Sequence, residues 1–103
     1  MRSHPRIIRG DFEWDADKAE KNIEDHEVKF EEATTVFEDP LFIVVKDPDH
    51  SVGEQRYIII GQSELRCYLL VSFAERDTRT RLISARELNP KERRAYEKRK
   101  ERF

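Results

Sequence analysis

Apolar runs in the second half of the chain predict four strands. They are LFIVVK (residues 41–46), QRYIIIG (55–61), RCYLLVSFAE (66–75) and TRLISAR (80–86), and turn signals separate them. Because the connections are short, we expect these runs to pair as an antiparallel meander. The stretch IIRGDFEW (7–14) predicts one further short strand around Gly10.

Apolar residues at helical spacing predict three helices. The first helix takes Asp15 or Asp17 as its N-cap and places Ala16, Ala19, Ile23 and His26 on its packed face. The second lies within VKFEEATTVFEDP (28–40), where Pro40 ends it. Asn89 caps the third, which occupies residues 89–103 with Pro90 at its first position and Glu92 completing a capping box.

The predicted order is strand, two helices, four strands and a last helix. This order indicates a single α+β domain over residues 1–103, with helices on a compact antiparallel sheet of about four to five strands. Residues 1–10 form an N-terminal extension or an edge strand. The last helix is basic, and its apolar residues are few (Ala95, Tyr96 and Phe103), so its own apolar area can hardly dock it.

Composition narrows the class of protein. Charged residues make up 41% of the 103-residue chain and hydrophobic residues 37%, which predicts marginal stability. No apolar stretch approaches the ~18 residues of a membrane span, no signal-peptide pattern opens the chain, and Cys67 has no disulfide partner. We therefore expect a soluble cytoplasmic protein without contact to a membrane.

The charge is distributed unevenly. Residues 11–54 hold 15 acidic residues and four lysines, whereas residues 79–103 hold ten basic and four acidic residues. The basic end suggests a polyanion or an acidic partner at one surface. The alternative is a solvated helix with i,i+4 ion pairs, which charge alone modestly favours.

The loop DPDHSVGE (47–54) contains Asp47, Asp49, His50 and Glu54, which are possible metal ligands. Its spacing does not fit a calcium loop, because Gly53 is seventh and Ile58 twelfth when Asp47 is counted as the first residue. A polar hairpin loop fits better. We therefore predict no metal and no cofactor.

Arginines in the strands are the stronger candidates. Simple alternation puts Arg81 and Arg86 on opposite faces of their strand, so both can serve one site only if the strand bends or bulges. Arg56 and Arg86 lie near strand ends, where guanidinium groups can bind phosphate. Ion pairs with Glu54, Glu75 or Glu87 are an equally good interpretation.

Two further side chains have two interpretations each. His26 is either a hydrogen-bonded core or cap residue or a general acid/base. Tyr96 either anchors the last helix or offers its ring and hydroxyl to a nucleotide.

Three stretches together resemble the BrnT family of toxins from bacterial type II toxin–antitoxin pairs. They are FEWDADKAEKNIEDHEVKFEEATTVFEDP, DPDHSVGEQRYIIIGQS and RLISARELNPKERRAYE, and with the intervening strand they span about residues 12–97. The resemblance implies a RelE-like fold and a ribonuclease that arrests translation. It also implies a BrnA-like antitoxin that neutralises the toxin, in a complex expected to hold two copies of each protein. Operator DNA is then bound only through the antitoxin.

The resemblance also implies a site. Candidates for catalysis are His26, Glu54, Arg56, Arg81, Arg86 and Tyr96, and candidates for RNA binding are Ser84, Arg93, Arg94 and Lys98. With no cluster of metal ligands, the expected reaction is metal-free attack of the RNA 2′-hydroxyl on the adjacent phosphate. The alternative function is a non-catalytic module whose basic end holds an acidic protein or nucleic acid, and a metal-dependent nuclease ranks third.

Two positions depart from the family pattern. Glu27 stands where the family has a glycine that ends the first helix, and Lys29 stands where it has a serine that caps the second. Each change is expected to cost about 1 kcal/mol.

Overall fold

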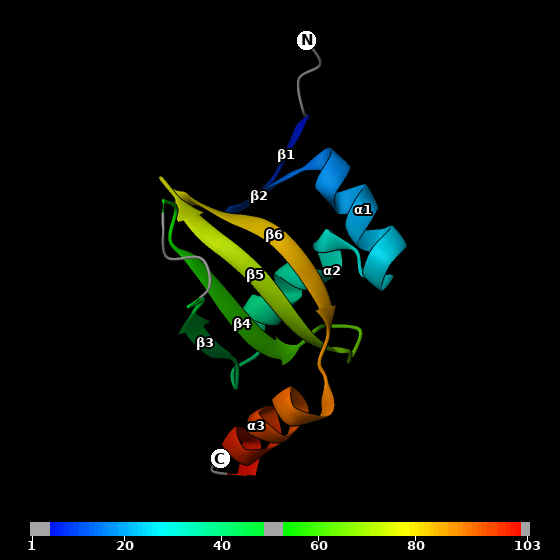
Figure 1. Ribbon diagram of the computed structural model, residues 1–103, viewed down its shortest axis with the longest axis vertical. Helices are drawn as coiled ribbons and strands as arrows, with labels where there is room; N and C mark the ends of the chain where they lie inside the picture. The colour runs from blue at the N-terminus through cyan, green and yellow to red at the C-terminus, as the bar shows by residue number, and fades with distance from the viewer. Residues whose placement is uncertain (1–4, 49–52, 102–103) are drawn as a thin grey trace.

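The computed structural model describes residues 5–48 and 53–101 (Figure 1). Its elements are β1 (Arg6–Arg9), β2 (Phe12–Asp15), α1 (Ala16–His26), α2 (Phe30–Thr34), the 3₁₀ helix η1 (Thr35–Glu38), β3 (Ile43–Lys46), β4 (Arg56–Gln62), β5 (Tyr68–Arg76), β6 (Arg79–Glu87) and α3 (Pro90–Glu101). None of the helices in these two described ranges is long and apolar enough to cross a membrane.

The sheet has six strands in the order β1-β2-β6-β5-β4-β3, and β2 runs parallel to β6. The prediction of four to five antiparallel strands is therefore wrong in number and in part in direction. The stretch predicted as one strand around Gly10 is a hairpin, in which Arg9 pairs with Phe12 and Gly10 has a φ of 58°. Because glycine adopts positive φ easily, the chain reverses there instead of continuing.

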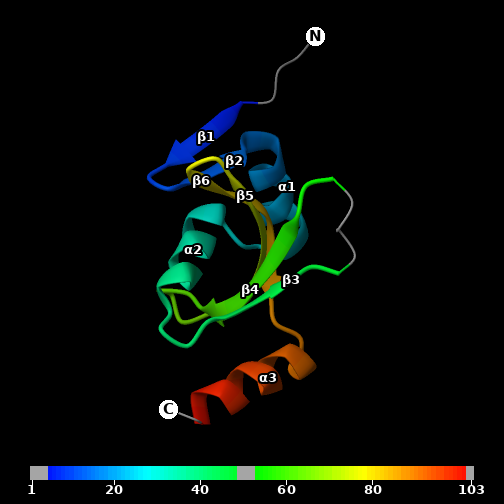
Figure 2. The ribbon, with the colours of Figure 1, turned by 90° about the vertical axis from the view of Figure 1, so that its left-hand side faces the viewer.

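The core lies between the sheet and the helices. Trp14, Phe30, Val36, Leu69 and Val71 are almost fully buried there. Figure 2 shows α2 on one side of the curved sheet, with α3 beyond the sheet's end. The side of the sheet on which α2 lies is called the covered face, and the opposite side is called the open face.

The packed face of α1 differs from the prediction. Ile23 is 43% exposed, whereas its neighbour Asn22 is 5% exposed. The Asn22 side chain donates to the Ala85 and Val28 carbonyls at 2.8 and 2.9 Å and accepts from the Ala85 N–H at 3.0 Å. The pairing of β2 with β6 covers only Thr80 and Arg81, so the backbone further along β6 needs another partner. Asn22 supplies it.

The expected N-caps of α1 and α3 are present, but the prediction of one second helix ending at Pro40 is wrong, because a short α2 gives way to the 3₁₀ helix η1, which ends at Glu38. Asp15 accepts hydrogen bonds from the backbone N–H groups of Asp17 and Lys18 at 2.8 and 3.1 Å. Glu27 adopts the left-handed conformation with φ 58°, and Lys29 precedes α2 without a side-chain cap bond. At both positions, therefore, the backbone conformation favours the residue of the family pattern over the residue present. A glycine fits the positive φ at position 27, and a serine at position 29 could cap α2.

The third helix begins with a complete capping box. The Asn89 N–H donates to Glu92 and the Glu92 N–H donates to the Asn89 side chain, both at 2.9 Å. One buried residue, Tyr96 (2% exposed), anchors α3. Its hydroxyl donates to Asp39 at 2.7 Å, and its ring lies 5.4 Å from that of Tyr68. Burial, and then the Asp39 carboxylate, raise the pKa of Tyr96.

Candidate functional site

A β-bulge in β6 sets which side chains share the open face. Ser72 pairs with Ser84, but Phe73 pairs with Leu82, so Ile83 is the extra residue. Leu82 and Ala85 are consequently both buried on the covered face. Arg81, Ser84 and Arg86 therefore all lie on the open face. The opposite-face expectation for the two arginines is wrong because simple alternation has no extra residue.

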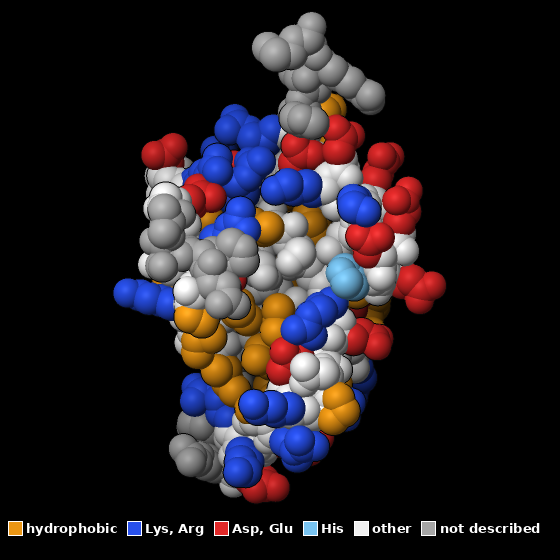
Figure 3. All heavy atoms as spheres, in the orientation of Figure 1, with side chains coloured by type: hydrophobic (Ala, Val, Ile, Leu, Met, Phe, Trp, Pro, Cys, Tyr) orange, Lys and Arg blue, Asp and Glu red, His pale blue; other side chains and the backbone are white. Residues whose placement is uncertain are grey.

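Four arginines gather at one end of the open face. In the register, Arg56 pairs with Ala74 and Ala74 with Arg81, so the two arginines stand on either side of a small residue. Two strand spacings separate their Cα atoms, roughly 10 Å. Arg76 and Arg79 pair directly beside them. Figure 3 shows Lys and Arg side chains grouped over this part of the molecule. These four residues are called the arginine cluster.

Two carboxylates accompany the arginine cluster. Glu54 pairs with Arg76 through two hydrogen bonds, one of them 3.1 Å long. Glu13, only 4% exposed, accepts a 2.9 Å bond from Arg81. The Arg76 hydrogen bond lowers the pKa of Glu54, and the charges of Arg56 and Arg81 lower it further, against the effect of burial. Glu54 is thus a carboxylate at neutral pH.

The balance of charge and hydrogen bonds at the cluster favours an anion. Four guanidinium groups face two carboxylates, and Arg56 has no ion pair with a residue in the described ranges. The Nε of Arg79 is buried and finds no hydrogen-bond partner among the described residues. A buried donor without an acceptor is costly.

The other predicted residues of the open face lie farther along β6. Arg81 pairs with Ala74 and Arg86 with Leu70, four residues apart on β5 and so roughly 13 Å, which is too far for one phosphate. Ser84 lies between them and shares a hollow of about 240 Å³ with His26 at the end of α1. Arg86 forms two 2.8 Å bonds to Glu92 and so links β6 to α3.

The remaining predicted residues lie on α3, away from the arginine cluster. Tyr96 packs on Tyr68 and Asp39. Arg93 lies 3.9 Å over the Tyr68 ring and pairs with Glu97 at 3.1 Å. Arg93 and Arg94 line a hollow of about 440 Å³, whereas Lys98 does not line it. These side chains form a second basic region beyond the end of the sheet.

Sequence reasoning missed Arg76, Arg79 and Glu13. The turn RDTR between two apolar runs was a usable signal, because a tight hairpin pairs the arginines at its ends. Glu13 gave no comparable signal, since its burial follows from β2 lying between β1 and β6.

The metal alternative is tested only in part. Asp49 and His50 lie outside the described residues. In residues 5–48 and 53–101, no three His, Cys, Asp or Glu side chains are grouped so that they could hold a metal ion.

Comparison with known proteins supports the fold. The fold is shared with a solved structure, the crystal structure of the Brucella abortus ribonuclease toxin BrnT. The two chains are 20% identical with a TM-score of 0.55, over 74% of this chain and 92% of that one. No curated protein matches this chain.

A family model described as "ribonuclease toxin, BrnT, of type II toxin–antitoxin system" matches residues 14–92. This match covers both helices that follow β2, the whole meander and the start of α3. The chain is therefore of the class of type II toxin–antitoxin ribonuclease toxins. Within that class it belongs to the BrnT family.

Proposed function

We propose that this chain is an endoribonuclease that cleaves RNA without a metal ion on the open face of β4, β5 and β6. The observation that carries the proposal is the arginine cluster, in which Arg56 and Arg81 flank Ala74 and the Arg79 Nε lacks a partner within the described residues. The RelE-like relationship implied by the sequence is part of the same proposal.

The scissile phosphate binds over Ala74, between Arg56 and Arg81. The 2′-oxygen of the RNA attacks the adjacent phosphorus, and the bond from phosphorus to the 5′-oxygen breaks. The products are a 2′,3′-cyclic phosphate and a 5′-hydroxyl. The two arginines neutralise the extra negative charge of the five-coordinate intermediate, where charge-assisted hydrogen bonds contribute most.

Glu54 accepts the proton of the 2′-hydroxyl. It can do so because it is ionised at neutral pH and lies beside the arginines that bind the phosphate. The 5′-oxygen needs a proton in return. Protonated Glu54 returns it in a one-carboxylate scheme, and His26 supplies it in a two-group scheme. Loss of cleavage in His26→Ala selects the two-group scheme, and unchanged cleavage selects the one-carboxylate scheme.

Arg56→Ala is the first test, because removing this side chain breaks no ion pair between described residues. We expect RNA cleavage to fall by about 100-fold or more, by analogy with the loss of one oxyanion donor. Arg9→Ala on β1 is the matched control and should cleave normally. Circular dichroism establishes that both variants are folded. Cleavage that is unchanged in Arg56→Ala refutes the site.

The metal dependence has its own test. Cleavage by the purified chain in EDTA should proceed at the unchanged rate and leave 2′,3′-cyclic phosphate ends. Loss of activity in EDTA with restoration by Mg²⁺ would overturn the metal-free scheme and favour a metal-dependent nuclease.

A cognate BrnA-like antitoxin completes the proposal. Family membership supports a protein partner that blocks the toxin, and the expected complex holds two copies of each protein and binds operator DNA through the antitoxin. Growth arrest by the chain alone, in the cytoplasm, should disappear when the protein of the neighbouring gene is co-expressed. Mass measurement of the purified complex checks the two-to-two ratio.

The alternative is a module that binds nucleic acid or an acidic protein without cutting RNA. Its support is the second basic region, where Arg93 and Arg94 line an open hollow at the far end from the arginine cluster. Lys98, also predicted to bind RNA, is on the same helix. If the unaltered chain binds RNA but neither cleaves it nor arrests growth, the alternative is correct.

A further inference from the structure

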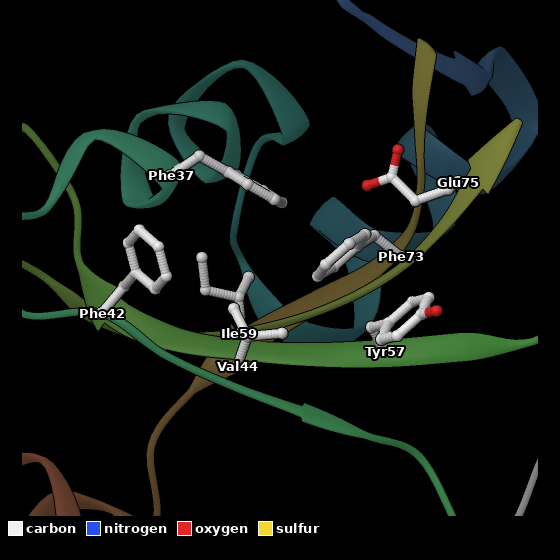
Figure 4. Close-up of a pocket in the computed structure, with 7 residues that line it drawn as sticks. All are labelled: Phe37, Phe42, Val44, Tyr57, Ile59, Phe73 and Glu75. Carbon is white, nitrogen blue, oxygen red and sulfur yellow. The ribbon is translucent and has the colours of Figure 1, made fainter. Parts of the chain in front are cut away.

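An aromatic pocket opens on the covered face, next to β3. It has a volume of about 330 Å³, and its walls are Phe37, Phe42, Val44, Tyr57, Ile59, Phe73 and Glu75. Figure 4 shows Phe37 and Phe42 on one side, Tyr57 and Phe73 on the other, and the Glu75 carboxylate at the rim. A volume near the lower end of the ~300–1,000 Å³ range of ligand pockets suits one long side chain.

The pocket walls are fixed by contacts among themselves. The Phe37 and Phe73 rings meet edge to face at 5.0 Å, and the Tyr57 and Phe73 rings stack at 5.5 Å. Phe37 also contacts Phe12 at 5.1 Å. Interlocked rings lose little freedom when a ligand enters, so the pocket is pre-organised.

The pocket adjoins a sheet edge that no described strand covers. β3 is the last strand of the sheet, and Phe42, Val44 and Val45 beside or within it are 40%, 42% and 50% exposed. The other edge strand, β1, begins and ends with arginine, which discourages pairing. β3 has three apolar residues in a row before its one lysine. It is therefore the edge that an added strand would join.

Glu75 indicates what enters the pocket. It is the one charged side chain among the pocket's described walls, and it forms no ion pair with a described residue. Its contact is a 3.4 Å hydrogen bond from the Thr80 hydroxyl. Aromatic faces with a carboxylate at their rim bind the aliphatic stem and cationic head of a lysine or arginine.

We propose that an extended segment of a partner protein adds to β3 as a seventh strand and places a Lys or Arg side chain in the aromatic pocket. Backbone pairing with β3 supplies affinity, and the cationic side chain next to Val44 supplies specificity. The neighbouring residues of the segment are apolar, because on the open face they lie beside Val45, which is 50% exposed. The proposal does not depend on RNA cleavage, since none of these residues belongs to the arginine cluster.

The probe is the peptide acetyl-Thr-Val-Lys-Val-Thr-amide, titrated into the ¹⁵N-labelled full chain and followed by NMR. We expect shift changes at Ile43–Lys46 and at the pocket rings. A peptide with norleucine instead of lysine keeps the stem but loses the charge, and it should bind about three- to tenfold more weakly. Replacing the valine before the lysine by proline removes a backbone donor and should weaken binding further.

Glu75→Gln keeps the size of the side chain and removes its charge, so it should reduce binding of the lysine peptide to that of the norleucine peptide. Glu24→Gln, an exposed change on α1, is the matched control and should bind as the unaltered chain does. Three results would overturn the proposal. They are shifts confined to the open face, equal binding of the two peptides, and pocket shifts caused by adenosine or uridine monophosphate in place of the peptide. A chain that binds the peptide but cleaves no RNA would refute the proposed function alone.

Discussion

Replacing Asn22 by alanine tests the least predictable contact of the fold. The change removes three buried hydrogen bonds, two donated to the Ala85 and Val28 carbonyls and one accepted from the Ala85 N–H. Each bond contributes about 0.5–1.5 kcal/mol net, and each buried group left without a partner costs about 1–3 kcal/mol. A loss near 3 kcal/mol follows, out of the roughly 5–15 kcal/mol typical of a domain.

The neighbouring residue is the matched control. Ile23 is 43% exposed, so Ile23→Ala loses only part of a buried side chain and gains helix propensity. We expect it to cost about 1 kcal/mol or less. Helical periodicity alone predicts the opposite, namely that Ile23→Ala destabilises the chain more than Asn22→Ala does.

The assay is urea unfolding at pH 7, followed by the fluorescence of the buried Trp14 and by circular dichroism. In urea, Asn22→Ala should lower the free energy of unfolding by about 3 kcal/mol. In a separate thermal unfolding experiment, the same loss corresponds to a melting temperature lower by about 12–24 °C, at ~4–8 °C per kcal/mol. The reasoning is refuted if Ile23→Ala destabilises more than Asn22→Ala, or if the latter costs under 1 kcal/mol.

Three other outcomes are expected. Glu27→Gly and Lys29→Ser should each raise the free energy of unfolding by about 1 kcal/mol, since the first relieves a positive φ and the second supplies a missing cap. Urea titration checks both. If neither substitution raises the free energy of unfolding, the cap assignments are wrong. The pKa of Tyr96 is raised in the folded chain, so the stability due to its neutral hydroxyl is complete below the unfolded pKa of about 10 and is lost as pH rises beyond it. Unfolding between pH 8 and 11 should show this loss, and Tyr96→Phe should abolish it. The pKa of Glu54 is lowered, so the rate of RNA cleavage should rise with pH through that lowered value and then level off. If Glu54→Gln shows the same rise at acid pH, Glu54 has no part in the mechanism.

Local signals were enough to predict the starts of α1 and α3 and the meander, but not the second helix, which is a short α2 followed by the 3₁₀ helix η1. Asn89 and Glu92 formed the expected capping box, and the four apolar runs became β3 to β6. These features depend on residues a few positions apart, for which propensity and turn chemistry are reliable guides.

Features that depend on distant pairing were not predictable in the same way. The alternation of β6 gives no sign that Ile83 is an extra residue, because the bulge is set by pairing with β5. Asn22 is buried because β6 lacks a strand partner beside it. Of the proposed site, Glu54, Arg56 and Arg81 were identified from the sequence, whereas Arg76 and Arg79 required the register of the hairpin.

The site also depends on when its parts become available. Glu13 bonds to Arg81 across 68 positions of sequence, and Asn22 bonds to Ala85 across 63. At a synthesis rate of about 5–20 residues per second, the first segment waits roughly 3–14 s for β6 to be made. During that interval the nascent chain carries β2 and α1 without the strand that buries them, and the arginine cluster is incomplete. Contacts of such long range also slow folding, and the proposed site cannot be complete before β6 is made. A newly made chain therefore passes through a period of several seconds in which the proposed RNA site does not yet exist.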